Sequence, residues 1–256
     1  VAAYIVTTFG GLNANGIRPL YYVQLIGFGL VIAFVWKAFV NPERMTPSRT
    51  SRRGGSGLIS GLRGVFKKGT RVKTWIAYTS LAEIPVWLGP VYWPLFAKVA
   101  KGADQYVIGY MTLATGVLPL LLALPFGRLA DIIGRKRVIY ITTPIFCSSL
   151  LLLIYARSPT ELVVSALLQG FLTLMSVTKA AMAVELVPID LLGMWLGLLG
   201  PFRGIISMVA APAIGGIVWE LFGPSYVFFF MILAMVISLL LLTTIPETLE
   251  RVPHGR

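Results

Sequence analysis

The chain has 256 residues, of which 57% are hydrophobic and 12% charged, and its mean hydropathy is +0.82. A soluble domain usually carries about 25% charged residues, so this composition excludes an ordinary soluble fold and indicates a protein whose solvent is lipid. The net charge of +12 does not indicate a nucleic-acid partner, because nine of the 22 Lys and Arg residues lie between Arg44 and Lys73 and four lie in residues 128–137, the clustering typical of membrane-topology signals.

The residue inventory also argues against most enzyme chemistry. Cys147 and His254 are the only cysteine and histidine of the sequence. The sequence therefore offers no disulfide, no thiol or histidine metal centre and no Ser-His-Asp triad. We expect neither enzyme activity, nor a metal, nor a cofactor.

Hydrophobic runs predict the membrane-spanning helices. A spanning helix needs about 20 apolar residues. Six segments have this character, at 20–40, 75–97, 106–126, 138–156, 161–184 and 225–246. A seventh, 194–219, contains Pro201, Arg203 and Pro212, and residues 1–11 resemble the last turns of an eighth. Because lipid offers no partner to an open strand edge, the pattern predicts an all-α membrane protein.

Four regions follow from these spans. We expect the end of a first bundle at 1–40, a basic linker at 41–73, a six-helix bundle at 74–250 and a tail at 251–256. The second half of the linker places apolar residues at helical spacing among cations. It is either a short amphipathic helix on the inner leaflet or a solvated charge run.

Lys and Arg predict the orientation. If the 41–73 linker faces the cytoplasm, then the 127–137 loop and the C-terminus do so as well, because the spans alternate. Sixteen cations then lie inside and four outside. This bias predicts a plasma-membrane protein with these three segments on the inner side, where anionic headgroups are expected partners.

An internal repeat places the chain within a larger plan. At an offset of 205 residues, Gly10-Gly11 matches Gly215-Gly216 and Pro19 matches Pro224. Residues 1–43 then correspond to the end of one half and residues 74–250 to a complete second half. We expect the sequence to be truncated, with about 130 residues missing upstream.

A motif in the 127–137 segment resembles the signature loop of the major facilitator superfamily, G-x-L-A-D-x-x-G-R-[KR]. The matching residues are Gly127, Leu129, Ala130, Asp131, Gly134, Arg135 and Lys136. The resemblance implies two six-helix halves joined by a cytoplasmic linker. It implies that the chain runs from the end of the fifth helix to the twelfth, with the loop in its second-half copy.

Two further segments are similar to motifs of this family. Residues after the predicted tenth helix fit E-x-x-P-x-x-x-R-G-x-x-x-G at Glu185, Pro188, Gly193 and Gly197, with Leu192 in place of the Arg. Pro246-Glu247-Thr248 resembles the usual exit from the last helix.

A third segment, Ala211-Pro212 followed by Gly215-Gly216, resembles a motif of drug–proton antiporters. That motif is diagnostic in the fifth helix rather than here, so close helix packing is the favoured interpretation.

The signature segment predicts gating contacts. Gly127 and Gly134 are expected to allow close approach and sharp turns. Arg135 can pair with a carboxylate, and Glu185 is the expected partner. We expect these residues, together with Asp131 and Lys136, to hold one conformation of a rocking transporter. The alternative is that the cations only set topology.

Glu83 is the first candidate for the transport path, because an ionisable residue within a span is costly and usually functional. The resemblance implies that its helix, which also carries Trp87, lines the cavity. Glu83 is a candidate proton carrier or counter-ion for a cationic substrate. A structural pair with a Lys or Arg and a wet position near the interface remain open.

Other polar residues extend this predicted path. Gln169, Thr173 and Ser176 lie on one helical face, which is expected to line the cavity. Lys179 flanks that face, and snorkelling to the headgroups is its favoured interpretation. Arg203 is expected to form a structural pair within the bundle, with an anionic substrate as the alternative.

Together these features predict a monomeric secondary transporter of a small molecule that works by alternating access, is proton-coupled and is efflux-like. Cationic or amphipathic substrates are expected from Glu83 and the aromatic residues. A symporter or facilitator for uptake of a sugar or organic acid stays open, as does a non-transporting sensor or scaffold on the same fold. The sensor hypothesis predicts a sealed cavity and a paired Glu83, whereas an open cavity reaching Glu83 and Gln169 would favour transport.

Overall fold

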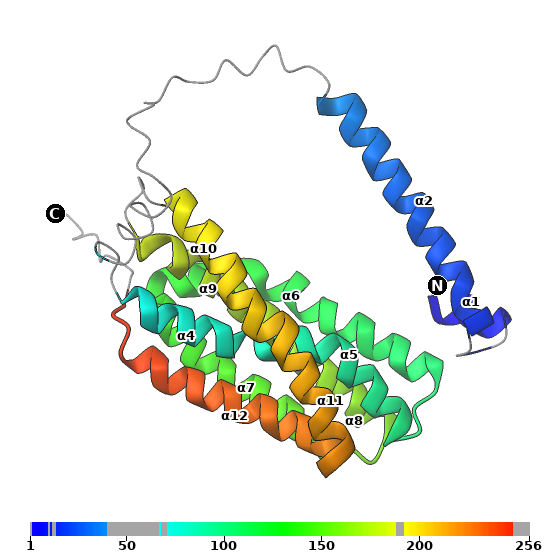
Figure 1. The fold of residues 1–256 in the computed structure, drawn as a ribbon. Helices are drawn as coiled ribbons and strands as arrows, with labels where there is room; N and C mark the ends of the chain where they lie inside the picture. The colour runs from blue at the N-terminus through cyan, green and yellow to red at the C-terminus, as the bar shows by residue number, and fades with distance from the viewer. Residues whose placement is uncertain are drawn as a thin grey trace.

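The computed structural model of this chain describes residues 2–9, 11, 14–39, 67, 71–187 and 192–247. Its elements are α-helices and one π-helical segment, η3 (Ile205–Ala210) (Figure 1). The α-helices are α1 (Ala2–Thr8), α2 (Ala14–Phe39), α4 (Val72–Ala82), α5 (Ile84–Val99), α6 (Gln105–Ile133), α7 (Arg135–Tyr155), α8 (Pro159–Gln169), α9 (Phe171–Glu185), α10 (Leu192–Gly204), α11 (Ala211–Phe222) and α12 (Pro224–Thr243).

The predicted spans reappear as long apolar helices. Six helical stretches within the described residues are long and apolar enough to cross a membrane: Asn15–Lys37, Gln105–Ile133, Arg135–Tyr155, Pro159–Glu185, Leu192–Phe222 and Pro224–Thr243. The span predicted at 75–97 corresponds to α4 and α5, which are separated at Glu83. The prediction of an all-α membrane protein is confirmed.

Most of the predicted linker lies outside the described residues. Between positions 40 and 70 the structure describes only Lys67, and it does not describe the tail at 251–256. The amphipathic helix and the boundaries of the four regions therefore stay predictions.

The signature segment is helical, which corrects the loop predicted at 127–137. Helix α6 continues to Ile133 and α7 begins at Arg135, so Gly134 alone separates them. Hydropathy ended the span at residue 126 because Arg128 and Asp131 lower the local average, but both residues are compatible with a helix that emerges from lipid. Gly134 has a φ of +102°, a conformation that favours glycine.

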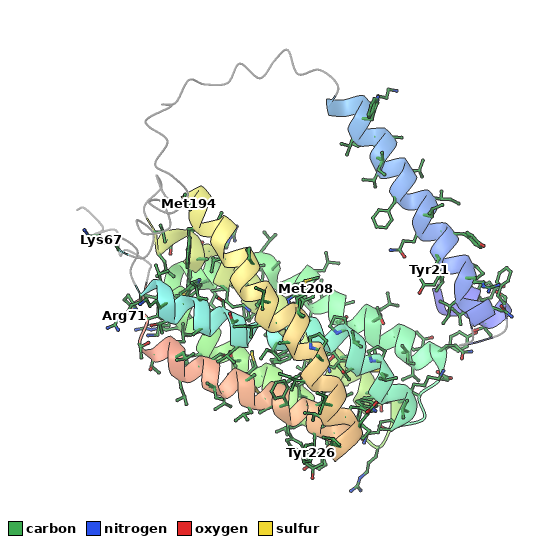
Figure 2. All side chains as sticks on the ribbon, viewed as in Figure 1. Tyr21, Lys67, Arg71, Met194, Met208 and Tyr226 are labelled. Atoms are coloured by element: carbon green, nitrogen blue, oxygen red, sulfur yellow. The ribbon has the colours of Figure 1, made fainter. Side chains whose placement is uncertain are left out.

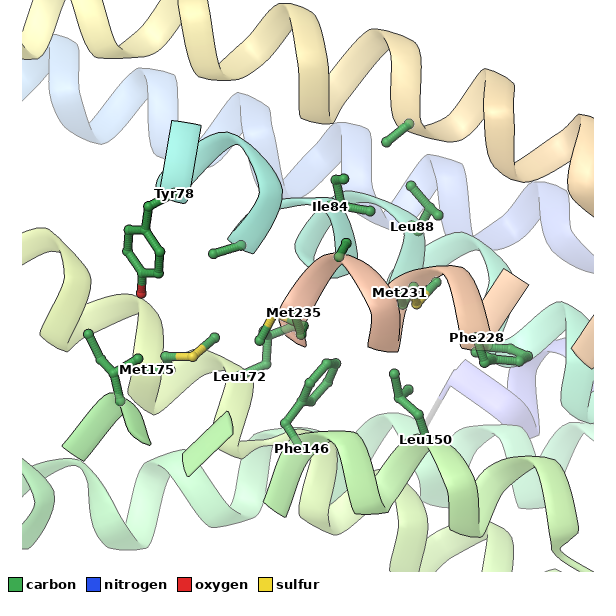
Figure 3. Close-up of a cluster of buried hydrophobic side chains, with 14 of the residues drawn as sticks. Tyr78, Ile84, Leu88, Phe146, Leu150, Leu172, Met175, Phe228, Met231 and Met235 are labelled. Carbon is green, nitrogen blue, oxygen red and sulfur yellow. The ribbon is translucent and has the colours of Figure 1, made fainter. Parts of the chain in front are cut away.

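The core of the bundle is a cluster of side chains contributed by every α-helix from α4 to α12, and Figure 3 labels the part from α4, α5, α7, α9 and α12. Phe146 of α7, Met175 of α9 and Met231 of α12 are among its members, and each is at most 1% exposed. The rings of Phe96 and Phe228 add an edge-on contact between α5 and α12 with centroids 4.8 Å apart. This packing holds together the helices that carry the candidate site.

Helix α2 contrasts with the bundle. Its side chains from Tyr21 to Lys37 are exposed on every side of the helix, as Figure 2 shows around Tyr21. Exposure also marks one face of α6, where Leu120 and Leu124 are more than 80% accessible. Apolar side chains on such surfaces are suited to lipid or to other apolar helices.

Candidate functional site

A break at Glu83 divides the first span of the bundle into α4 and α5. Pro85 has no amide hydrogen and cannot donate to a preceding turn. The Val86 amide donates to Glu83 O at 3.0 Å, which spans three residues instead of the four of an α-helix. The Glu83 amide still donates to Thr79 O at 3.0 Å, with the α-helical spacing of four. The span therefore has the C-terminal end of a helix inside it, next to an acidic side chain.

Lys179 of α9 binds this helix end. Its Nζ lies 3.1 Å from Glu83 Oε1 and donates to Ala82 O at 3.3 Å. Glu83 is 9% exposed and Lys179 3% exposed. A cation at a helix C-terminus and beside a carboxylate is stabilised by both.

The Glu83–Lys179 pair bears on two hypotheses made from the sequence, one for each residue. The expectation that Lys179 snorkels to the headgroups is wrong, because its ammonium lies against Glu83 inside the bundle. The pairing of Glu83 with a lysine is the contact that the structural alternative required. Trp87, one turn further along α5, is 40% exposed.

A second break lies in the span Pro159–Glu185, at Gly170 between α8 and α9. The Gly170 amide donates to Leu167 O at 3.1 Å. A Cβ at this position would lie 2.8 Å from Pro119 Cδ and 3.0 Å from Thr115 O of α6. Glycine is needed here because α6 crosses closely at this point.

Gln169 precedes this break and is 2% exposed. Neither its amide nitrogen nor its amide oxygen has a hydrogen-bond partner within the part of the chain that the structure describes. Buried side-chain amides are normally hydrogen-bonded, so an unpartnered one needs an explanation.

A cavity of about 200 Å³ lies beside Gln169, between α5, α6 and α8. Its walls are formed by Pro90, Trp93, Pro94, Ile108, Met111, Thr112, Thr115, Ala166 and Gln169. The Trp93 indole nitrogen is buried and is likewise without a partner among the described residues. Gln169 and Trp93 both line this cavity, although their unpartnered polar atoms are themselves shielded by the surrounding protein.

The remaining members of the predicted polar stripe differ from Gln169. Thr173 is exposed, and the Ser176 hydroxyl donates to Leu172 O at 3.0 Å within its own helix. Of the three, only Gln169 is among the residues that line this cavity. The side chain of Arg203 lies outside the described residues, so its predicted pairing is not described.

Gly89 fixes the position of the Trp93 ring. A Cβ at this buried glycine would collide with the indole of Trp93, one turn later on α5. The Trp93 ring also faces Phe146 of α7, with centroids 6.5 Å apart. Sequence reasoning missed Trp93, although the Gly-x-x-x-Trp spacing on a span that carries Glu83 is a recognisable signal.

At the end of the bundle that carries residues 127–137, Arg135 joins two acidic residues. Its guanidinium forms an ion pair with Glu185 at the end of α9. Asp131 lies 3.8 Å away, one turn earlier. The predicted Arg135–Glu185 pairing is present. Gly127 does not have the close approach expected of it, because a Cβ there would meet nothing within 4 Å.

Lys136 and Glu247 form a reciprocal contact at the same end. The Lys136 ammonium donates to Thr243 O at 3.1 Å and to Ile245 O at 2.6 Å, at the C-terminus of α12. The Glu247 carboxylate accepts from the Lys136 amide at 3.3 Å, at the N-terminus of α7. Each charge matches the dipole of the helix end that it meets.

Glu247 gives a second reason for glycine at position 134, besides its positive φ. A Cβ there would lie 2.7 Å from Glu247 Oε2. The sequence placed Glu247 only at a helix exit. Its contact with α7 joins residues more than 100 positions apart and is not visible in local sequence patterns.

The Pro212–Gly216 segment packs against α5. The Tyr92 hydroxyl donates to Pro212 O at 3.2 Å, and a Cβ at Gly215 would lie 3.1 Å from the Tyr92 ring. The small residues make room for an aromatic side chain, as expected from the close-packing interpretation of this motif.

The fold and these contacts define a multi-pass helical membrane protein with breaks inside two spans. The family model of the Major Facilitator Superfamily matches residues 86–256, which is more than half of the chain. The chain belongs to this superfamily.

Two relatives agree with this assignment. They are described as uncharacterized MFS-type transporters of Mycobacterium tuberculosis, from strains CDC 1551 and H37Rv. Each is 28% identical over 160 residues, which cover 62% of this chain and 23% of the relative. The chain thus matches under a quarter of the length of these relatives.

Proposed function

We propose that the protein is a secondary transporter that moves a small molecule across the plasma membrane by alternating access. The observation that carries the proposal is the open cavity between α5, α6 and α8, because a concave, mostly apolar site with a few polar residues in its walls is suited to a small-molecule ligand. Membership of the superfamily and the transporter names of two relatives support it.

Flux measurements test the proposal. The complete protein that contains this chain is reconstituted in proteoliposomes, and uptake and release of a labelled compound panel are followed. We expect saturable flux of at least one small molecule, reduced by Gln169→Leu. Absence of flux for every compound, in protein that is folded and inserted, would contradict it.

We also propose that protons drive this transport, in the direction of export. Protonation of Glu83 would remove its attraction for Lys179 and release the ammonium from the end of α4. The break at Glu83 would then be free to change conformation. Glu83→Gln is expected to reduce proton-driven flux more than tenfold while exchange of substrate across the membrane persists. Glu220→Gln, an exposed carboxylate of α11, is the matched control.

The Glu83–Lys179 pair favours a second candidate function, a non-transporting sensor or scaffold on the same fold. That hypothesis required a paired Glu83, and the pair is present. It also required a sealed cavity. The cavity at Gln169 opens to the surface, but Glu83 is not among its lining residues, so the opposing expectation of an open cavity reaching both residues is met at Gln169 alone. Ligand binding without flux in the reconstitution would favour the sensor.

We propose that the contacts of the 127–137 segment act as a gate on the cytoplasmic side. Arg135 ties α7 to α6 through Asp131 and to α9 through Glu185, and Lys136 ties α7 to the end of α12 and to Glu247. Asp131→Asn is expected to slow turnover several-fold without loss of membrane insertion. An unchanged turnover rate would leave the segment a topology signal only.

Cysteine labelling tests the proposed orientation. In a Cys147→Ser background, Arg137→Cys and Arg157→Cys place single thiols at exposed positions on opposite ends of α7. A membrane-impermeant maleimide added to intact cells is expected to label position 157 and not position 137. The reverse pattern would invert the proposed topology.

A further inference from the structure

We infer that a cleft between the end of α6, the start of α7 and the segment after α12 binds the head group of an anionic phospholipid, whose acyl chains lie along the exposed face of α7. The cleft has a volume of about 540 Å³. Its walls combine apolar and charged side chains, among them Ile132, Ile133, Tyr140, Lys136, Arg137 and Glu247. The site is separate from the cavity between α5, α6 and α8 and does not depend on the proposed transport.

The cleft lies at the depth where head groups meet acyl chains. The apolar stretch Gln105–Ile133 ends in its wall, and the stretch Arg135–Tyr155 begins there. The third stretch, Pro224–Thr243, ends beside it, because the Lys136 ammonium donates to Thr243 O. A hydrocarbon core that covers these stretches leaves the cleft at the polar surface of the bilayer.

Arg137 is the cation of this cleft that an anion can use. The Lys136 ammonium is bound to two carbonyls at the end of α12, and the Glu247 carboxylate accepts from the Lys136 amide. Arg137 is exposed, and its side chain has no hydrogen bond or ion pair to any other residue that the structure describes. A guanidinium on a long, unrestrained side chain can turn to a phosphate in the cleft and bind it with two parallel hydrogen bonds.

The exposed face of α7 continues from Arg137 as a single stripe. Its members follow one another at spacings of three or four residues: Ile141, Pro144, Ser148, Leu151 and Tyr155. The Ser148 hydroxyl donates to Pro144 O within the helix, so the stripe offers an apolar surface to an acyl chain. On the other side of the cleft, Ile132 of α6 is 78% exposed. A cation above apolar surfaces of this kind matches a phospholipid, with its phosphate above its chains.

The opposite end of α7 has a different balance of charge. A cleft of about 220 Å³ there contains Lys101, Arg157 and Asp104. The Lys101 ammonium donates to Ile154 O at 2.6 Å. The Glu161 carboxylate accepts from the Arg157 amide at 2.7 Å, so two carboxylates accompany the two cations. An anionic head group is therefore expected at the α6–α7 cleft and not at this one.

Quenching by nitroxide-labelled lipids tests the inference. In a Cys147→Ser background, Ile141→Cys carries a bimane fluorophore on the stripe, one turn from Arg137. In a second preparation, Leu151→Cys carries it further along the same stripe. The full chain is placed in phosphatidylcholine nanodiscs that contain a small fraction of either phosphatidylglycerol or phosphatidylcholine with a nitroxide near the head-group end of one acyl chain.

We expect labelled phosphatidylglycerol to quench position 141 more strongly than the same fraction of labelled phosphatidylcholine, and the two lipids to quench position 151 equally. Arg137→Gln should lower the preference for phosphatidylglycerol about fivefold, the effect of one arginine at a membrane surface. Arg128→Gln is the matched control, because it removes an equal charge from an exposed position of α6 outside the cleft walls. It should leave the preference in place.

Competition separates a lipid site from a site for any phosphate. Unlabelled phosphatidylglycerol should relieve the quenching at position 141, and soluble glycerol phosphate should not. The inference is overturned by equal quenching by the two lipids at position 141, by an unchanged preference in Arg137→Gln, or by an equal loss in Arg128→Gln. Relief by glycerol phosphate overturns it as well, since the anion would then bind without the acyl chains.

Discussion

The span formed by α4 and α5 and the span formed by α8 and α9 contribute to two kinds of buried polar site. In one, Glu83 and Lys179 satisfy each other, and Lys179 also binds the carbonyl of Ala82. In the other, Gln169 and the Trp93 indole have unused hydrogen-bonding groups beside a cavity. Both sites lie next to a helix break, and both use α5 or its neighbour α4 together with α8 or α9.

The difference shows that formal charge is a poor guide to the residue that meets a ligand. Glu83 is the costlier group to bury, but its cost is offset within the protein. Gln169 is neutral and less costly to bury, but nothing among the described residues offsets that cost. The side chain whose hydrogen-bonding capacity is unmet among the described residues is therefore the neutral one.

Breaking the ion pair should give the largest effect. Lys179→Met leaves Glu83 buried without its cation and is expected to lower the free energy of unfolding by about 3–5 kcal/mol. Thermal unfolding in detergent, followed by tryptophan fluorescence, measures this loss. The exposed Lys98 of α5 provides the control Lys98→Met, which should have little effect.

A double variant tests whether the loss of stability comes from the unpaired charge of Glu83. Glu83→Gln combined with Lys179→Met removes both charges and should recover most of the lost stability, since no unpaired ion remains. If the double variant is as unstable as Lys179→Met alone, the pair is not the reason for the loss.

Adding a side chain at Gly170, where α6 crosses closely, should have the next largest effect on stability. Gly170→Ala places a methyl group against Pro119 and Thr115 O of α6, and is expected to cost about 1–3 kcal/mol through overpacking. Gly116→Ala in α6 is the control, because a Cβ there meets nothing within 4 Å. Equal thermal stability of the two variants would show that α8 and α6 are not held as closely as the structure has them.

Gln169→Leu should raise the stability of the protein, whereas the preceding variants lower it. Without ligand, the change removes buried amide groups that have no partner and should raise the free energy of unfolding by about 1 kcal/mol. Thermal unfolding of the ligand-free protein measures the gain. Gln105→Leu, which removes the hydrogen bond from Gln105 Nε2 to Thr7 Oγ1, is the control and should show no gain. A loss of stability in Gln169→Leu would mean that the amide already has a partner.

Thr173→Val should have the smallest effect. Thr173 is exposed, and its replacement by a residue of the same shape should change stability by less than about 0.5 kcal/mol. The same unfolding assay applies. A larger change would show that the whole polar face of α8 and α9, rather than Gln169 alone, is constrained.

The sequence predicted the helices better than their interruptions. Apolar length is sufficient to locate a span, and the helices at Pro159–Glu185 and Pro224–Thr243 lie within a few residues of the predicted ranges. Pro85 and Gly170 were visible in the sequence, but whether such a residue bends or breaks a helix depends on the neighbouring helices that re-satisfy its backbone.

The candidate site was predictable only in part, because contacts between distant helices are not visible in local sequence patterns. Arg135 and Glu185 were paired from the sequence because each terminates a predicted span on the same side. Lys179 was assigned to the headgroups, since its partner at Glu83 lies on a distant span. The importance of Gln169 over Thr173 and Ser176 follows from the position of α6, which no periodicity within α8 and α9 encodes.

The single residue between α6 and α7 has a mechanical consequence. Gly134 contributes two backbone dihedrals between helices of 29 and 21 residues, and Lys136 and Glu247 clamp its far side to α12. A change in the tilt of α6 would therefore have to be accommodated by the two dihedrals of Gly134 or passed to α7, which is joined to the end of α12 at this point.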